Sequence, residues 1–435
     1  MSIFEGFGSN FELNASLQPS YDGFGLFTAS QTAGRIAFVN RDLMICKSTV
    51  KQCKNKRLQD SLLELERSLP EVHERLYIIS FLLLLKKDTP KAFLEYNEKL
   101  PKVVGSPIGW NEESIEYQLL EGTGLDMSVN AKKSKLIAEF DHLKPIFEII
   151  SSDICLEDFI WADYILWSRA MSFNQLNPNY KDDLHIVPII DFCNHSQTPN
   201  ASWTLKDSGM ELHLHNNVHL KSNEEIFISY GDKPNSELLF LHGFTLEENS
   251  NNSIAIPLPF IEYTMENQSE KILLKQKLIK DLNLSRIIEV HSPGFYKCHK
   301  DFSLNSLKGM VSNISFITLI LCVLTDEQEL PNDQSIFSNI DSIESLKTLM
   351  ENLKDIDIVQ LRLFAILSDV ISGYIESLSQ ELEDEMKGLN VKVRFVEILR
   401  RKQLETLLDA QKVLILLQQK FSMKPSVIEY LHSNS

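Results

Sequence analysis

Hydrophobic and polar positions follow two different periods along this 435-residue chain. Short β-rich runs, such as GLFTAS and RIAFVN, are separated by Gly, Asn and Asp up to about residue 48. From residue 58 to 175, apolar residues recur every three or four positions, as they do on one face of a helix. The strand pattern returns between residues 186 and 244, in IVPII, ASWTL, MELHLHNNVHL and EEIFISY. The pattern therefore predicts a β-rich core that is split by a helical insertion.

The pattern changes again after the segment IPLPF, where the strand signal stops. Long amphipathic segments follow, and apolar residues between Leu404 and Phe421 lie along one helical face. We therefore place the β-rich domain at residues 15–250, its helical insertion at residues 58–175 and a separate all-helical domain at residues 251–435. The predicted fold class is α+β.

Neither of the two most apolar runs is long enough to cross a membrane. These runs are LYIISFLLLL, from Leu76, and ISFITLILCVL, from Ile314, whereas a membrane helix needs roughly 20 apolar residues. The N-terminal segment MSIFEGFGSNFELNAS has neither the basic region nor the apolar core of a secretory signal. We therefore expect buried helices, no membrane association and a cytoplasmic location, with the nucleus as an alternative.

Composition and charge narrow the classes of partner. Hydrophobic residues make up 43% of the chain and charged residues 24%, which is usual for a folded soluble protein. Asp and Glu number 60 against 43 Lys and Arg, so the formal net charge is −17. The resulting field repels a phosphate backbone and attracts cations. We therefore expect no nucleic-acid partner and favour a basic protein, although an acidic surface also serves solubility alone.

The cysteine spacing gives no sign of a disulfide framework or a metal site. The chain has six cysteines and no C-x-x-C pair, and a chain of this length needs no disulfides to be stable. We expect free thiols in a reducing compartment and no metal.

Three short segments carry glycine and polar residues that a purely structural role would use poorly. The first is DGFGLF, residues 22–27, in which Gly23 and Gly25 stand between apolar residues. Glycine lets the backbone approach a ligand closely, because no Cβ stands in the way. A plain turn between two strands would explain the same residues.

The second segment is IVPIIDFCNH, residues 186–195, where an apolar strand runs into Asp191, Asn194 and His195. The amide and the imidazole have donors and acceptors that can hold an amino, carboxylate or purine group. A strand that ends in an Asx-turn is the structural alternative.

The third segment is EEIFISYGDKPNSELLFLHGF, residues 224–244. Tyr230 ends a β run and is followed by Gly231 and Asp232, so we expect its phenol at the mouth of a pocket. An edge aromatic whose hydroxyl faces water is the alternative.

The order of these motifs resembles that of the SET-domain methyltransferases. Ser168-Arg169-Ala170 closes the helical insertion between the G-x-G and D-x-x-N-H segments, and I-S-Y-G, N-x-E-L-L and G-F follow. The chain is similar to the class typified by the Rubisco large-subunit lysine methyltransferase. In that class a helical insertion splits the SET fold, and a helical substrate-binding domain follows it. The segment GWNEESIEYQLLEGTGL resembles a stretch of that insertion. The resemblance covers residues 20–250 by motif and the remainder by architecture.

This resemblance implies S-adenosyl-L-methionine as the cofactor. The backbone around the G-x-G turn would hold its methionine part, Asn194 and His195 would complete the pocket, and Phe244 would pack near the adenine. The segments that carry Asn194 and Tyr230 would be threaded as a pseudoknot, which is rare among folds. The cofactor-binding residues that the resemblance implies are Asp22, Gly23, Phe24, Arg169, Asp191, Asn194, His195, Tyr230 and Phe244.

The resemblance also implies the substrate side of the site. Tyr230 would be catalytic, because its hydroxyl would fix the target nitrogen while positioning does most of the work. Arg169 and Asp191 would line the lysine channel. His242 stands where the family often has Tyr before the Gly-Phe pair, so the number of methyl groups added stays open. The absence of a Cys-rich tail after Tyr230 argues against the zinc-bearing, histone-modifying branch.

The predicted function is methyl transfer to the side-chain amine of a lysine in a non-histone protein. The acidic charge favours basic targets, such as a ribosomal protein or a translation factor, and we expect a monomer. One alternative is a protein-histidine methyltransferase of the same fold. Another is a catalytically silent SET scaffold that binds a partner, although intact Tyr230, Asn194 and His195 argue against it.

Overall fold

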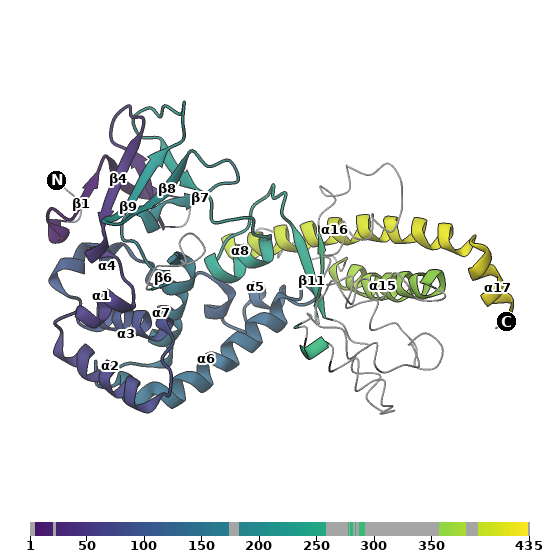
Figure 1. The fold of residues 1–435 in the computed structure, drawn as a ribbon, viewed down its shortest axis with the longest axis horizontal. Coiled ribbons are helices and arrows are strands. Elements are labelled where there is room, and N and C mark those ends of the chain that lie inside the picture. The colour runs from purple at the N-terminus through teal and green to yellow at the C-terminus, as the bar shows by residue number, and fades with distance from the viewer. Residues whose placement is uncertain are drawn as a thin grey trace. The chain divides into compact units, whose positions relative to one another are not determined.

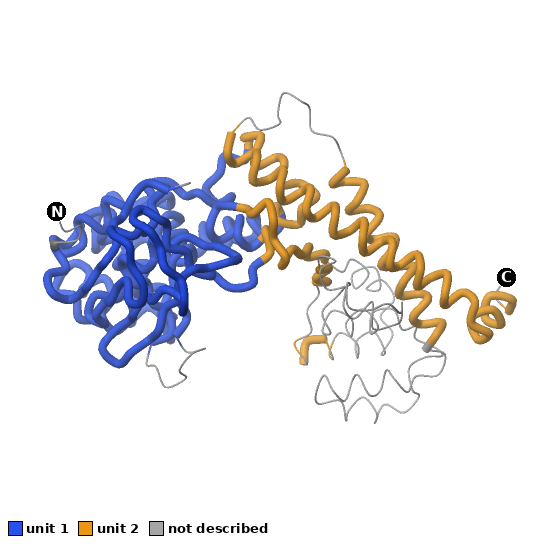
Figure 2. Tube along the Cα trace, turned by 90° about the horizontal axis from the view of Figure 1, so that it is seen from above, with its two compact units in different colours: residues 1–112, 127–233, 237–244 blue, residues 113–126, 234–236, 245–435 orange. Residues whose placement is uncertain are grey.

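The computed structural model describes residues 5–20, 23–173, 182–257, 277, 279–281, 283, 287–291, 356–379 and 390–433. The chain divides into two compact units, which Figure 2 shows in two colours. Unit 1 consists of residues 1–112, 127–233 and 237–244, and unit 2 consists of residues 113–126, 234–236 and 245–435.

Unit 1 contains two four-stranded sheets built from strands that are far apart in the sequence. Several lie close together at the top of Figure 1. The first sheet has the order β1-β4-β9-β8, with bounds Phe11–Leu13, Arg35–Asn40, Gly209–Leu214 and Ala201–Lys206. The second has the order β2-β3-β10-β7, with bounds Ala15–Ser20, Gly23–Thr28, Glu225–Ile228 and Asn194–His195. The strands predicted on both sides of the insertion are therefore paired with one another.

The second sheet contains strands from all three polar segments and pairs these strands with one another. In it, β10 is antiparallel to β3, with Glu225 opposite Phe27. It is also parallel to β7, with Phe227 opposite Asn194 and Ile228 opposite His195. Parallel strands need a long connection between them, and here the connection includes β8 and β9.

The insertion between the strands is helical, as predicted. Its first helix has an N-cap at Asn55, whose side chain accepts a hydrogen bond from the amide of Leu58 (3.1 Å) and so satisfies a free N–H of the first turn. The helices that begin in the predicted insertion and lie in unit 1, wholly or for most of their length, are α3 (Glu74–Lys87), α4 (Leu94–Lys99), α6 (Leu125–Phe147) and α7 (Leu156–Arg169). The shorter α1 (Lys47–Gln52) and the capped α2 (Lys56–Ser68) come directly before them.

The apolar run LYIISFLLLL is the centre of α3, and every residue from Leu76 to Leu85 is buried. The protein itself thus covers this run, as expected of a core helix. Arg75, at the start of α3, forms ion pairs with Glu139 of α6 and Asp163 of α7, each at 2.7 Å. A largely buried charge is costly unless it is paired, so these contacts help to define how the three helices pack.

Unit 2 contains long helices and a two-stranded sheet. Arg400 donates to the backbone carbonyl oxygens of Leu119 (3.1 Å), Glu121 (2.6 Å) and Ser377 (3.1 Å), which joins three separate segments of the unit. Among the described residues, the helices that lie wholly in this unit are α5 (Ile115–Gln118), α15 (Ile356–Leu378), α16 (Val391–Ser422) and α17 (Pro425–Ser433).

The sheet of unit 2 corrects one prediction. It pairs β11 (Ser253–Pro257) with β12 (Ile287–His291) in antiparallel register, whereas only helices were expected after residue 251. The short run IIEVH is too brief to stand out beside long amphipathic segments, and its pairing partner is distant in the sequence. The α+β class and the helical character of this region are as predicted.

Within the described part of the chain, α15 is long and apolar enough to cross a membrane by length and composition alone. Core helices of soluble proteins pass the same test. The ring of Phe364 in α15 packs edge-on against Phe421 of α16, with ring centroids 5.1 Å apart. The expected absence of membrane association stays a prediction, and the run from Ile314 lies outside the described residues.

Candidate functional site

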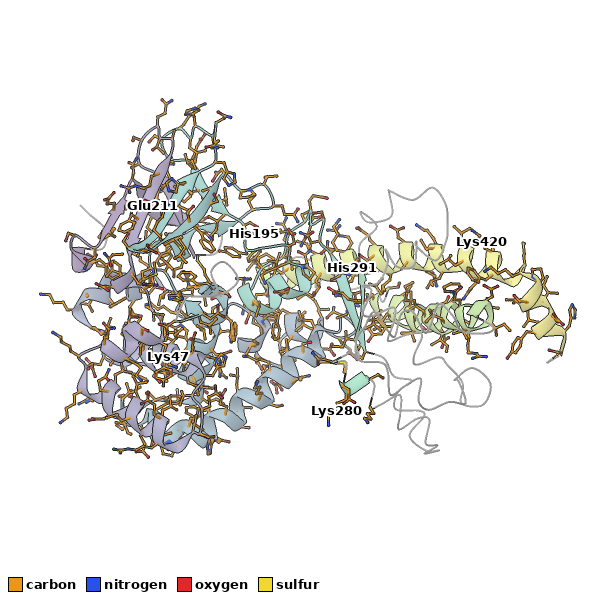
Figure 3. All side chains as sticks on the ribbon, in the orientation of Figure 1. Lys47, His195, Glu211, Lys280, His291 and Lys420 are labelled. Carbon is orange, nitrogen blue, oxygen red and sulfur yellow. The ribbon has the colours of Figure 1, made fainter. Side chains whose placement is uncertain are left out.

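The parallel pairing of β7 and β10 brings two of the polar segments together. The hydroxyl of Tyr230 donates to the backbone carbonyl of Cys193 (2.8 Å). The amide of Tyr230 donates to Nδ1 of His195 (3.0 Å). The side-chain amide of Asn194 donates to Oε1 of Glu225 (2.7 Å). Three consecutive residues therefore hold β10 and the segment that follows it, and Figure 3 labels His195 in this part of unit 1.

The hydroxyl of Tyr230 has a partner inside the protein, because it donates to the Cys193 carbonyl, and the side chain as a whole is half-buried. Burial raises the pKa of Tyr230 well above its usual value, although the nearby Arg169 charge opposes the shift. The phenol is therefore protonated at neutral pH, and its oxygen keeps lone pairs that can accept a hydrogen bond.

The glycine-bearing turn adjoins the same residues through β3. A Cβ on Gly25 would lie 2.2 Å from Oε1 of Glu225 and 2.9 Å from Nδ2 of Asn194, so only glycine leaves room for that hydrogen bond. Gly23 has φ +144°, and the position of a Cβ there is open space. Phe24 is half-buried, and the ammonium of Lys99 lies 4.9 Å from its ring centroid. Asp22 lies outside the described residues.

Four rings gather at this point. The ring centroid of Tyr230 lies 5.2 Å from that of His195, 4.7 Å from that of His242 and 6.5 Å from that of Phe244. Gly243 between the last two has φ +86°, and a Cβ there would lie 2.8 Å from the backbone of Gly105. Because a side chain does not fit, glycine allows the turn that directs both rings to one cluster. Aromatic faces of this kind attract cations.

A buried ion pair borders the ring cluster. Nη1 of Arg169 lies 3.2 Å from Oδ2 of Asp191 and also donates to the Asp191 backbone carbonyl (2.9 Å). The hydroxyl of Tyr96 donates to the same Oδ2 (2.7 Å). The Arg169 guanidinium lies over the ring of Phe192, 4.7 Å from its centroid. Asp191 was expected to line a substrate channel, and the structure shows that one of its oxygens is already used inside the protein.

The backbone before Asp191 departs from the prediction. The run IVPII was expected to be a strand. Within this run only Ile186 has a strand-like pairing, an isolated bridge with Ile45. Pro188 cannot donate a backbone hydrogen bond, and Ile189 has φ 78° and ψ −58°. A β-branched residue with positive φ is strained, and such strain tends to occur at functional sites.

Three buried polar atoms at this site lack a hydrogen-bond partner among the described residues. They are Nε of Arg169, Oδ1 of Asp191 and Nε2 of His242. Buried polar groups in folded proteins are nearly always paired. Three such atoms around one cluster therefore indicate a place that suits a polar ligand.

His242 presents a defined hydrogen-bond acceptor. Its Nδ1 lies 3.2 Å from the Ser168 carbonyl oxygen, which can only accept, so Nδ1 carries the proton and Nε2 a lone pair. Burial lowers the pKa of His242 to about 3, and the charge of Lys233 adds to this shift. Burial also lowers the pKa of His195. Both rings can accept a hydrogen bond, but neither is suited to act as a general base at neutral pH.

Glu225, the packing role of Gly25 and the contact of Tyr96 with Asp191 were not predicted from the sequence. Glu225 also accepts a hydrogen bond from the hydroxyl of Ser20 (2.8 Å), so it fixes both β2 and Asn194. An acidic residue at the start of a strand gives no signal of such a role. Only Gly25 was detectable, as part of the G-x-G pair.

Several known proteins are similar to this chain. Residues 23–231 match the model of the SET domain family. The chain is 25% identical over 427 residues to SET domain-containing protein 8 of Schizosaccharomyces pombe, covering 95% of this chain and 93% of the relative. It is 30% identical over 196 residues to the chloroplastic fructose-bisphosphate aldolase lysine N-methyltransferase of Arabidopsis thaliana, and the match covers 42% of this chain and 39% of that relative. It is 24% identical over 189 residues to the actin-histidine N-methyltransferase of Xenopus tropicalis, and the match covers 41% of this chain and 32% of that relative. The chain thus spans less than half of the last two relatives.

A solved structure supports the fold along most of the chain. The SET domain of LSMT bound to lysine and AdoHcy matches with a TM-score of 0.68 and 16% sequence identity, covering 94% of this chain and 88% of that chain. At this identity the likeness concerns the fold alone.

The buried state of His242 predicts a pH-dependent stability. Its folded pKa, about 3, lies below its ordinary value of 6.5. The unfolded chain therefore binds more protons between these values, and the stability that neutral His242 contributes is lost as the pH falls through this window. Urea unfolding should show that the wild type loses about 2 kcal/mol relative to His242→Gln between pH 6.5 and 4.5.

Replacement of the exposed His142 by Gln is the matched control for the substitution itself. A difference between the wild type and His242→Gln that stays the same from pH 6.5 to 4.5 would show that burial does not lower the pKa of His242.

Proposed function

We propose that the chain is a SET-domain methyltransferase that uses S-adenosyl-L-methionine, and that its acceptor is the side-chain amine of a lysine in a protein other than a histone. The observation that carries the proposal is the meeting of the Tyr230 hydroxyl, the Asn194-His195 pair and the glycine-bearing strand β3 at one place. The expected family and cofactor agree with the comparisons.

The residues at the site suit this cofactor. It carries a carboxylate, an ammonium group, an adenine and a cationic sulfur. Unpaired Nε of Arg169 can donate to an anionic group, and unpaired Oδ1 of Asp191 can accept from a cationic one. The open space at Gly23 suits a close approach to the backbone. The rings of Tyr230 and Phe244 offer faces to a cation and to a purine.

When bound, the cofactor supplies a methyl group that its positively charged sulfur has already activated. The task of the chain is to place an uncharged amine in line with it. The phenol oxygen of Tyr230 is fixed by its bond to Cys193 and can accept an N–H of the amine. No side chain is needed as a strong base, because burial near a positive charge favours the neutral amine.

His242 supports lysine rather than histidine as the acceptor. Its Nε2 and the Tyr230 oxygen are two hydrogen-bond acceptors on neighbouring rings, whose centroids lie 4.7 Å apart. The attacking nitrogen of a lysine amine has N–H groups for both of them. The attacking nitrogen of an imidazole has none, so two acceptors would be left without partners.

A protein histidine remains the second candidate acceptor. The 24% identity to an actin-histidine N-methyltransferase favours it, because that relative has the same domain type and a different acceptor. The two candidates differ in the methylated residue itself, which can be identified directly.

The wider cellular role belongs to the same proposal. The net charge of −17 favours a basic protein substrate, such as a ribosomal protein or a translation factor, and disfavours nucleic acid. We infer a monomer in the cytoplasm or the nucleus, without membrane association. The number of methyl groups added depends on how His242 holds the amine.

The acceptor can be determined in a cell extract. Incubation of the full chain with extract and radiolabelled S-adenosyl-L-methionine should label a basic protein. Mass spectrometry of the labelled band should find methyl-lysine outside the histones. Methylhistidine would replace the lysine proposal with the second candidate, and a chain that neither binds cofactor nor labels any protein would be a silent scaffold.

Replacement of Tyr230 by Phe tests its proposed role. We expect turnover to fall by on the order of 100-fold, because one oriented polar group at the reacting nitrogen is lost. Cofactor affinity, measured by calorimetric titration, should stay close to that of the wild type.

The matched control is Tyr77→Phe, which removes the bond from the Tyr77 hydroxyl to Glu66 (2.7 Å) inside the helical insertion. It should retain normal turnover. Equal turnover in Tyr230→Phe and the wild type would remove Tyr230 from the mechanism.

A further inference from the structure

Three side chains of metal-binding type meet at a second place in unit 1. They are Cys46, Asp182 and His185, which are 2%, 5% and 2% exposed. The sulfur, a carboxylate oxygen and a ring nitrogen all lie within 4.8 Å of one another. Neither Cys46 nor Asp182 nor His185 belongs to the proposed cofactor site. In Figure 3, Lys47, which follows Cys46, is well separated from His195.

The fold holds two of these residues in fixed register. The amide of Ile45 donates to the carbonyl of Ile186 (2.8 Å), and the amide of Ile186 donates to the carbonyl of Ile45 (3.0 Å). Cys46 follows Ile45, and His185 precedes Ile186. The backbone bridge therefore places the thiol and the imidazole together, and Asp182 lies just before the short strand β6 (Leu184–His185).

Two of the three side chains, those of Asp182 and His185, have further contacts that orient them. Oδ2 of Asp182 accepts from the amide of Ser48 (3.0 Å), at the start of α1. The imidazole of His185 stacks on Phe173, with ring centroids 3.9 Å apart and planes 10° from parallel. Its Nδ1 lies 3.1 Å from the Asp183 carbonyl oxygen. A carbonyl only accepts, so Nδ1 carries the proton and Nε2 has the lone pair, as in histidines that bind metals.

The carboxylate of Asp182 is buried, and the amide of Ser48 donates to it. Among the ion pairs of the described residues, none joins Asp182 to a Lys or Arg side chain within 4.0 Å. A buried carboxylate is more stable beside an opposite charge. A divalent cation would balance both this carboxylate and a Cys46 thiolate.

We propose that Cys46, Asp182 and His185 bind one divalent transition-metal ion of the Zn²⁺ type. Thiolate, imidazole and carboxylate are the three kinds of ligand that Zn²⁺ takes in proteins, and three protein ligands leave one tetrahedral position for water. The ion would tie the start of α1 to β6 and stabilise unit 1. No metal was expected from the sequence, because these residues are distant in the chain and form no spaced motif.

The first test uses Co²⁺ as a probe on the full chain after removal of metals with a chelator. One equivalent should produce the near-ultraviolet absorption of a thiolate bound to Co²⁺, and added Zn²⁺ should abolish it. The band should disappear in Cys46→Ser and remain in Cys53→Ser, whose thiol lies at the other end of α1. The absence of the band in the wild type would overturn the proposal, and this outcome does not depend on whether any variant folds. An equal band in Cys46→Ser would overturn it as well.

The second test measures the thermal midpoint with Zn²⁺ alone. An ion that binds the folded chain and not the unfolded chain raises the midpoint. The rise should occur in the wild type and in His142→Gln, which changes an exposed histidine, and it should be lost in His185→Gln. An equal rise in His185→Gln would assign the ion to another place and contradict the proposal.

Discussion

The parallel pairing of β7 with β10 is the interaction on which the proposed site depends. It sets Cys193, Asn194 and His195 against the segment from Glu225 to Tyr230, with hydrogen bonds of 2.7–3.0 Å. A shift of one residue would turn every side chain of β7 to the opposite face of the sheet. The methyltransferase chemistry needs little more than accurate placement, so this register is a condition of the function itself.

The site retains features that a purely structural core would avoid. Ile189 has a positive φ, a backbone conformation that β-branched residues rarely adopt. Arg169, Asp191 and His242 each have a buried polar atom without a hydrogen-bond partner among the described residues. Proteins accept such local departures where function requires them. They coincide here with the residues that the family resemblance assigns to cofactor and substrate, which supports one polar site.

The sequence was most informative where the signal is local. The β4 run RIAFVN and the buried helix α3 follow from periodicity, and Tyr230, His195 and Asn194 follow from motifs in a known order. Contacts between distant segments could not be predicted, because no periodicity encodes them. Glu225 supporting Asn194, strand β12 and the Cys46 cluster are of this kind.

We propose that β3, β7 and β10 together hold one methyl donor. Calorimetric titration of S-adenosyl-L-methionine into Gly25→Ala measures whether they do, because the added methyl group would displace Glu225 and Asn194. We expect affinity at least about tenfold weaker than that of the wild type, a loss of about 1.4 kcal/mol. Gly373→Ala, where a Cβ meets nothing within 4 Å, should bind normally. Unchanged affinity in a folded Gly25→Ala chain would contradict the account.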